Sequence, residues 1–557
     1  MLALLAAPAQ AACNMGPSGV HGNLCSAPAS IHIPVEYRTI APVLVLGIGA
    51  LALLTISAVM PKRSRPGLWA GLTALVGAGA GVVSALEWAD INKHGPSVAI
   101  GQQIFYDHFS VLFMLLISVA TIFGALLADS YLQREGLDGV EAYVLMLLCG
   151  TGAMLMAESA GLIMLFLGLE IMSIALYVLS AYHRRRSQSG EAGLKYFILG
   201  SFSSAIFLYG VALIYGATGS TQFGEMASYL ARNTLSHNGV LLAGIALLIV
   251  GLGFKVAAVP FHFWSPDVYQ GAPTPFTGYM AAVAKAAGFA GLVRALLQGL
   301  GSQQVNWRPI IWVLAVLTLL VGSVMALAQR DLKRMLAYSS ISQAGYVLIG
   351  LQAASPDGTA SLTFYLLTYT FIIAGSFAVV GLIQGKGESR SDLGAIAGLS
   401  QRRPALAAAM LVFLLAQAGV PFTSGFLAKF YVIQAAVNRG QYALAVIGML
   451  SAAIAAFFYL RIALLMYRPV GGDEALEAGD GALGAGLAPV ASLDDRPSPY
   501  GDQLVAPASV ALQAPPDTRI PIPFTVGITL AVCVAFTIFA GVSSPVIDFA
   551  RHATLIF

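Results

Sequence analysis

Six ionisable side chains stand out because each lies within or beside an apolar stretch. A charged residue in the middle of a membrane span costs about 2.5–3.5 kcal/mol on the insertion scale, and such residues usually mark the path of an ion or a proton. Desolvation disfavours a charged lysine and a nearby carboxylate favours it, so moving the carboxylate away releases a proton. These residue types therefore predict a proton relay, whose candidate members are Glu170, Lys195, Lys255, Lys285, Lys429 and His262.

Some of these residues also have structural interpretations. Glu170 and Lys255 can form an ion pair that only fixes helix packing. Lys195 lies near the start of its apolar stretch, where the long side chain can reach the membrane edge. His262 follows Pro260 and can be a hydrogen-bonded structural residue rather than a proton carrier.

The composition restricts the class of protein. Of 557 residues, 58% are hydrophobic and only 10% are charged, against about a quarter charged in soluble domains. A polytopic membrane protein in a lipid bilayer follows. The net charge of +3 is too small to indicate nucleic acid. The chain has no Cys-x-x-Cys pair or Cys/His cluster, so we expect it to bind no metal and no cofactor.

The sequence contains about fourteen apolar runs that are long enough to cross a bilayer, since a span needs roughly 20 residues. Because only helices or closed barrels cross the hydrocarbon, and these runs are too long for barrel strands, we predict an all-α polytopic bundle. The predicted spans are 41–60, 68–88, 108–128, 141–157, 160–182, 194–217, 239–262, 276–297, 308–328, 333–353, 360–384, 405–436, 441–467 and 524–545.

Basic residues in alternate loops predict the orientation. The loops after spans one, five, nine and eleven are basic, and the opposite loops are poor in lysine and arginine. The basic end is therefore predicted to be cytoplasmic, with both termini extracytoplasmic. The basic residues are Lys62, Arg63 and Arg65, then Arg184, Arg185 and Arg186, then Arg330, Lys333 and Arg334, then Lys386, Arg390, Arg402 and Arg403.

The chain divides into four predicted regions. Residues 1–40 are predicted to form an N-terminal leader or extracytoplasmic segment, and 41–467 the main transmembrane domain. Residues 468–522 are rich in Pro, Gly and Ala without periodicity, which predicts a flexible cytoplasmic linker. Residues 523–557 hold the last span.

Two of the predicted spans are interrupted, each near a lysine. Pro260 has no N–H to donate to the carbonyl of Val256 and breaks the seventh span. The twelfth span, 405–436, is too long for one crossing and has Gly419, Pro421 and Gly425 in its middle. Broken helices at corresponding places are typical of transporters built from repeats. We predict two five-helix repeats, spans 4–8 and 9–13, inverted because the number of helices in each is odd.

Three segments resemble one known family. They read GFKVAAVPFHFWSPDVYQGAPTPFTGYMAAVAKAAGFA (253–290), QRDLKRMLAYSSISQAGY (329–346) and GVPFTSGFLAKFYV (419–432). They resemble the antiporter-like membrane subunits of respiratory complex I, over about residues 100–467. Within that family the N type is favoured over the L and M types. This chain stops soon after its last span, carries lysine at 429 where the M type has glutamate, and contains AGLKYFILGSFSSAIFLYG (192–210).

The resemblance implies a role for each charged residue. Glu170 and Lys255 would be the buried pair of helices five and seven, and Lys195 would modulate that pair from helix six. Lys285 would connect the two halves, and Lys429 would be the terminal lysine near the outside. One departure is Gln343, where family members often have histidine; glutamine does not titrate.

The implied function is proton translocation in the membrane arm of an NADH-quinone oxidoreductase of the bacterial plasma membrane. This chain would hold no redox centre, because NADH, FMN, iron–sulfur clusters and quinone would act in other subunits. Its partners would be other membrane subunits of the complex, in the lipid bilayer. Three alternatives remain open: a subunit of a multisubunit cation/proton antiporter, a passive scaffold whose buried charges only fix helix packing, and the membrane arm of a hydrogenase.

Overall fold

The computed structural model describes residues 36–59, 67–233, 238–388, 391–468, 520–543 and 545–553. Most of the predicted leader and linker lies outside these residues, as do Lys62, Arg63, Arg65 and Arg390.

The described chain is almost entirely helical. The elements run η2 (Tyr37–Ile40), α1 (Ala41–Val59), α2 (Leu68–His94), β1 (Ser97–Ala99), β2 (Ile104–Tyr106), α3 (His108–Glu135), α4 (Glu141–Glu158), α5 (Leu162–Ser180), α6 (Ser187–Thr218), α7 (Phe223–Arg232), α8 (Gly239–Lys255), α9 (Trp264–Gly271), α10 (Thr274–Val293), η3 (Arg294–Gly299), η4 (Gly301–Gln303), α11 (Gln304–Leu327), α12 (Leu332–Gln352), α13 (Pro356–Ile383), η5 (Lys386–Glu388), η6 (Leu393–Ile396), α14 (Leu399–Arg402), α15 (Pro404–Ala418), α16 (Ser424–Asn438), α17 (Tyr442–Tyr467), α19 (Phe524–Val542) and α20 (Pro545–His552).

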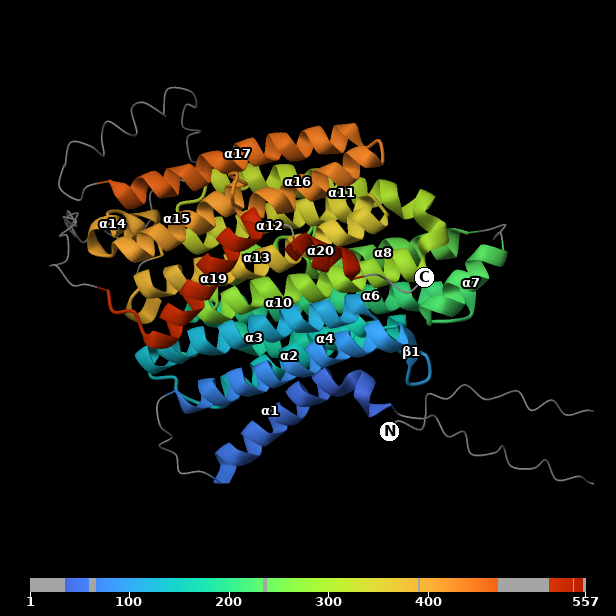
Figure 1. The fold of residues 1–557 in the computed structure, drawn as a ribbon, viewed down its shortest axis with the longest axis horizontal. Coiled ribbons are helices and arrows are strands. Elements are labelled where there is room, and N and C mark those ends of the chain that lie inside the picture. The colour runs from blue at the N-terminus through green and yellow to red at the C-terminus, as the bar shows by residue number, and fades with distance from the viewer. Residues whose placement is uncertain are drawn as a thin grey trace, which may run out of the picture.

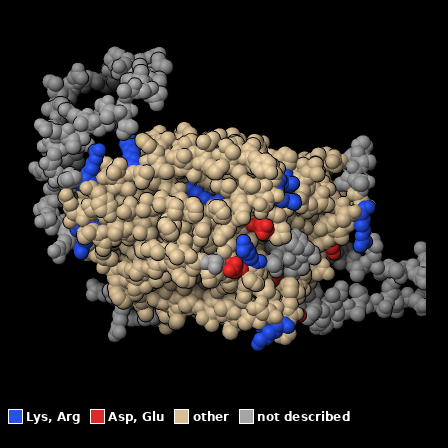
Figure 2. Space-filling model, turned by 45° about the horizontal axis from the view of Figure 1, so that its top comes forward, with Lys and Arg blue, Asp and Glu red and all other residues tan. Residues whose placement is uncertain are grey.

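The long helices lie side by side along the longest axis of the molecule (Figure 1). The earliest helices form one side and α17 the other, while α10, α12 and α13 lie between them. Every residue of α10 is buried, and so is every residue of α12 except Arg334. The flank is an almost uncharged surface, as a lipid-facing band requires, with few Lys, Arg, Asp and Glu side chains (Figure 2).

Eleven helices among the described residues are long and apolar enough to cross a membrane. Two shorter apolar helices, α8 and α15, are the first halves of the spans predicted to be broken. The multi-span helical architecture is thus confirmed, whereas the count of fourteen is not. Helix α12 is not among the eleven; it begins with Lys333 and Arg334 and carries several hydroxyl groups.

Loops predicted to share one face do meet. Leu332 donates its backbone N–H to Ser391 O and Leu393 donates to Arg330 O, which joins the loops that follow α11 and α13. Arg186, before α6, binds Glu388 in η5. At the other end β2 bridges Ser159, and Gly161 bridges Gln222 before α7. Successive loops therefore lie at alternate ends of the bundle, as the order of the predicted spans requires.

Both broken helices share the sequence Val-Pro-Phe at the break. It occupies 259–261 between α8 and α9, and 420–422 between α15 and α16. The same order of elements, three long helices, a broken helix and a straight helix, occurs from α4 to α10 and from α11 to α17. The second break is tight: a Cβ on Gly425 would lie 1.8 Å from Ala416 O, so only glycine lets α16 begin against the end of α15.

Candidate functional site

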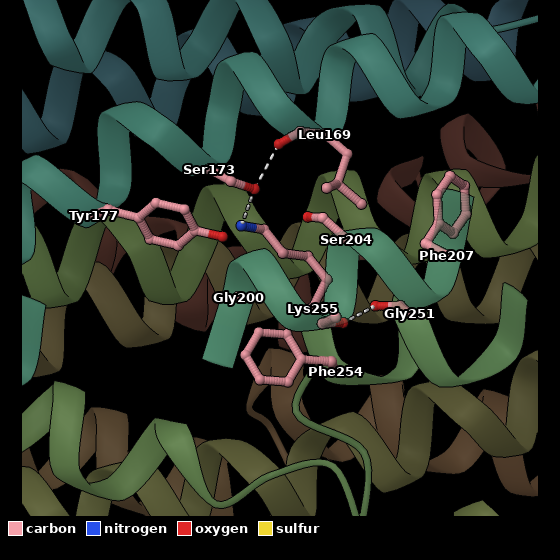
Figure 3. A pocket seen from close by; sticks show the side chains of 10 residues that line it. Leu169, Ser173, Tyr177, Gly200, Ser204, Phe207, Gly251, Phe254 and Lys255 are labelled. Atoms are coloured by element: carbon pink, nitrogen blue, oxygen red, sulfur yellow. Dashed lines mark hydrogen bonds between the residues drawn. The ribbon is translucent and has the colours of Figure 1, made fainter. Parts of the chain in front are cut away.

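Lys255 is the last residue of α8, and its side chain is buried. Its Nζ donates to Ser173 Oγ at 2.8 Å and to Tyr196 OH at 3.3 Å. The negative end of a helix dipole favours a cation, so the break at Pro260 provides a favourable place for an ammonium group. Helices α5, α6 and α8 line a small pocket around it (Figure 3).

Glu170 does not form the expected direct ion pair with Lys255. No salt bridge within 4 Å joins these two described residues, and Glu170 Oε1 is buried without a hydrogen-bond partner. Ser173, one turn further along α5, takes the ammonium instead. Because residues three apart share a helix face, the carboxylate and the serine are neighbours on α5.

Tyr196 connects Lys255 to the second half of the broken helix. Its ring stacks on Trp264 of α9, with centroids 4.4 Å apart and planes within 4°. Trp264 Nε1 also donates to Phe254 O, the carbonyl next to Lys255. The position of α9 is thereby coupled to the surroundings of the Lys255 ammonium.

Lys195 lies near the start of α6 at the surface, with 44% of its side chain exposed. Its Nζ binds Glu191 Oε1 at 2.7 Å and Asp267 Oδ2 at 2.9 Å. Asp267, on α9, also binds Arg334 at 2.6 Å. Lys195 is therefore apart from the buried lysines and holds α9, which agrees with the interpretation that its ammonium reaches the membrane edge.

Lys285 lies in the middle of α10, fully enclosed by protein. Its Nζ donates to Ser340 O of α12 and faces the Tyr369 ring at 5.5 Å. Within the described residues no carboxylate lies within salt-bridge distance of it. A neutral amine or a charge shared with hydroxyl and carbonyl groups fits this site.

Gln343 joins the surroundings of Lys285 to those of Lys429. It lines a tightly packed space with Lys285 and Tyr365, whose hydroxyl donates to Gln343 Oε1. Gln343 Nε2 donates to Tyr459 OH at 3.1 Å and to Gln417 O at 3.2 Å. The glutamine thus occupies the centre of a hydrogen-bonded network of α12, α13, α15 and α17.

Lys429 binds the end of the preceding half-helix. Its Nζ donates to Gln417 O at 2.7 Å and Ala418 O at 3.0 Å, two carbonyls that α15 leaves unpaired at its end. It also lies 4.8 Å from the centroid of the Tyr346 ring. Both terminal lysines of the proposed relay therefore lie at the negative end of the first half of a broken helix.

The elements that carry the three buried lysines contact one another in order. Helix α8 packs on α10, α10 packs on α12 and α13, and both of these pack on α16. Lys255, Lys285 and Lys429 thus lie on a lateral series of helices across the molecule. His262 is buried in the break, its ring 6.5 Å from that of Tyr338 of α12, and its Nδ1 has no hydrogen-bond partner.

Several buried charged residues were not predicted from the sequence, because they lie at helix ends. Glu388 of η5 binds Lys333 at 2.9 Å and Arg186 at 2.7 Å, and accepts from Thr274 N at 2.8 Å. Burial alone would raise the pKa of Glu388, but these cations and hydrogen bonds lower it to about 2. Glu388 thus ties both five-helix units together. The only sequence signal is an acidic residue in a loop rich in basic ones.

A second missed pair is Arg294 with Asp107. Both side chains are fully buried, and the guanidinium makes two bonds to the carboxylate, at 2.6 and 2.8 Å. Burial opposes the charge of Asp107, but Arg294 outweighs it and leaves the pKa of Asp107 below its usual value. A bidentate ion pair of this kind fixes the arrangement of the chain at the end of α10.

Comparison with known proteins decides the family. The family described as "NADH:quinone oxidoreductase/Mrp antiporter, TM" matches residues 159–455. NADH-quinone oxidoreductase subunit N of Trichlorobacter lovleyi is 42% identical over 448 residues, 80% of this chain and 90% of that one. The chain belongs to the NADH-quinone oxidoreductase subunit N family. Subunit N 2 of Roseiflexus castenholzii is 43% identical over 464 residues, 82% of this chain and 92% of the relative.

Solved structures include chains with the same fold. A chain of respiratory complex I from Thermus thermophilus, solved with bound aureothin, is 34% identical, covers 79% of this chain and 94% of its own, and has a TM-score of 0.65. An archaeal membrane-bound sulfane sulfur reductase (24%, TM-score 0.74) and the Mrp complex of Dietzia (22%, TM-score 0.76) each cover 93% of this chain and 97% of their own chain. These two show that the fold is shared.

Proposed function

We propose that this chain is a proton-translocating membrane-arm subunit of an NADH-quinone oxidoreductase, in which Lys255, Lys285 and Lys429 carry the proton. The observation that supports it most is the placement of three buried lysines on helices that contact one another in series. The identity with subunit N relatives over most of their length supports the complex.

The first step takes place around Lys255. Ser173 and Tyr196 hold the ammonium, and the Glu170 carboxylate on the same face of α5 stabilises its charge. A change in the position of α9, transmitted by the Trp264 stack, or in the charge of Glu170 releases the proton toward Lys285. Lys195 and Asp267 set the position of α9 in this scheme.

The second step runs from Lys285 to Lys429. Ser340, Gln343 and Tyr365 surround Lys285, and Gln343 shares the acceptor Gln417 O with Lys429. Glutamine holds no exchangeable charge, so in this chain the hydroxyl groups of Tyr365 and Tyr459 carry the proton past it.

The redox chemistry belongs to other subunits in this proposal. NADH, FMN, iron–sulfur clusters and quinone act there, and this chain binds none of them. The basic loop end faces the cytoplasm and both termini lie outside, in the bacterial plasma membrane.

The test is recovery of the chain from native membranes. A tagged chain is extracted in mild detergent, and the purified fraction is assayed for NADH-dependent quinone reduction. The proposal predicts that activity follows the chain in one large complex. Recovery with small membrane proteins only, without NADH oxidation, contradicts it and favours the cation/proton antiporter alternative, which sodium-loaded vesicles would then test.

A further inference from the structure

Two glutamates near the ends of α2 and α4 lie outside the row of lysines. Glu87 of α2 is 3% exposed and Glu158, the last residue of α4, is 0% exposed. All four of their carboxylate oxygens are buried without a hydrogen-bond partner. Helices α2 and α4 contact each other, on the side of the bundle where α1 to α4 lie (Figure 1).

The cations near these carboxylates are already neutralised. Arg294, which acts on Glu158, holds Asp107 with two short bonds. Arg38, which acts on Glu87, holds Asp90 at 2.5 Å. Glu87 and Glu158 are close enough for their charges to repel each other.

Two ionised carboxylates are untenable here. An unpaired charge in the interior costs several kcal/mol, and repulsion adds to that cost. A bound metal ion does not resolve this, because Ca²⁺ and Mg²⁺ require about six oxygen ligands. The described residues contain no group of three or more His, Cys, Asp and Glu that could hold a metal. A proton is the ligand that fits.

One face of α2 leads from this pair to the surface. Glu87, Asp90 and His94 are three and four residues apart, which aligns them along the helix. Asp90 accepts from Tyr106 OH at 3.1 Å and lies 2.8 Å from His94 Nδ1. The His94 side chain is 70% exposed, at the end of the molecule opposite the Glu388 cluster.

We propose that Glu87 and Glu158 form a proton-binding site, separate from the lysines, that exchanges its proton with the surface through Asp90 and His94. The site holds at least one proton at neutral pH. It gives the first helices, which carry none of the relay lysines, a role in proton exchange at the end predicted to be extracytoplasmic.

The state of the pair is measured by infrared difference spectroscopy of the whole purified complex. The difference spectrum, wild type minus Glu158→Gln, is expected to show a protonated carboxylic acid band that the variant has lost. Glu87→Gln is measured in the same way, and loss of the acid band in at least one of the two variants supports the proposal. Loss of only an ionised carboxylate band in both variants overturns it. Glu141→Gln is the matched control on α4, where the exposed carboxylate is expected to contribute only an ionised band.

The proposed route through Asp90 and His94 is tested by the rate of hydrogen–deuterium exchange at the pair after transfer of the complex into D₂O. The acid band is expected to shift quickly in wild type, and about tenfold or more slowly in Asp90→Asn, because the variant lacks the acid–base group next to the pair. Asp129→Asn, on α3, serves as the control and leaves the rate unchanged. Equal exchange in Asp90→Asn and wild type overturns the route.

Discussion

At the scale of single residues, hydroxyl and carbonyl groups rather than carboxylates contact the three buried lysines. The residues Glu170, Lys255, Lys285 and Lys429 were identifiable from the sequence because an isolated charge in an apolar run is conspicuous. Their partners were not, because Ser173, Tyr196 and Gln417 are ordinary residues on other helices. The direct Glu170–Lys255 pair was expected and is absent, since the side chain of Lys255 reaches Ser173 instead.

Ser173 gives the first prediction. Ser173→Ala removes the shortest hydrogen bond to the Lys255 ammonium, worth about 1.5–3 kcal/mol because the donor is charged. We expect NADH-driven proton transport to fall about fivefold or more. The control is Ser203→Ala, which lines the same pocket but bonds to Gly251 O and is expected to remain near wild type. Equal transport in Ser173→Ala and Ser203→Ala contradicts this role.

Gln343 gives the second prediction. Gln343→Leu keeps the volume and removes the bonds to Tyr459 and Gln417, which leaves buried polar groups unpaired. Proton transport is expected to fall about tenfold, and Gln343→His, which keeps a donor and an acceptor, to retain most of it. The measurement is acidification of vesicles during NADH oxidation. If Gln343→Leu pumps as wild type does, the network is not part of the path.

At the scale of elements, the two broken helices followed from the sequence through proline and glycine. What did not follow is how they are held. Helix α9 is fixed by Asp267 between Lys195 and Arg334, and these residues are 72 and 67 positions from it in sequence. Contacts at such separations exist only once the fold has formed, so the bond of Lys195 to Asp267 at the surface was not predictable from the sequence.

Gly425 tests the second break. Gly425→Ala places a Cβ 1.8 Å from Ala416 O, a backbone atom that cannot move without unwinding α15. We expect a loss of at least about 3 kcal/mol and little assembled complex. Gly216→Ala on α6 is the matched control, because no atom lies within 4 Å of its added Cβ. Complex levels are compared on native gels, and normal assembly of Gly425→Ala would show that the break has a different geometry.

At the scale of the whole molecule, the sequence predicted the membrane class, the two units and the sides on which loops meet. It did not predict the Glu388 cluster that joins the units, because the residues come from two loops and from the starts of α10 and α12. Hydrophobic pattern specifies helices, whereas the joining of units depends on polar contacts that have no periodic signature.

Glu388→Gln tests how much this cluster contributes to stability. Removing one partner of a buried charge cluster costs about 3–5 kcal/mol, so the complex is expected to dissociate at a lower temperature. The pKa of Glu388 falls from 4.5 to about 2 on folding, so its contribution is complete above about pH 4.5 and is lost as the pH falls toward 2. The difference in thermal midpoint between wild type and variant should therefore shrink in acid. Glu191→Gln, in an exposed ion pair, is expected to change little.

The most direct test of the central claim is the number of protons moved per NADH oxidised by the complex in sealed vesicles. We predict that Lys255→Met and Lys429→Met each lower this ratio in assembled complex, while Lys93→Met, which removes an exposed lysine, leaves it unchanged. An unchanged ratio in both buried-lysine variants would mean that this chain does not carry the proton.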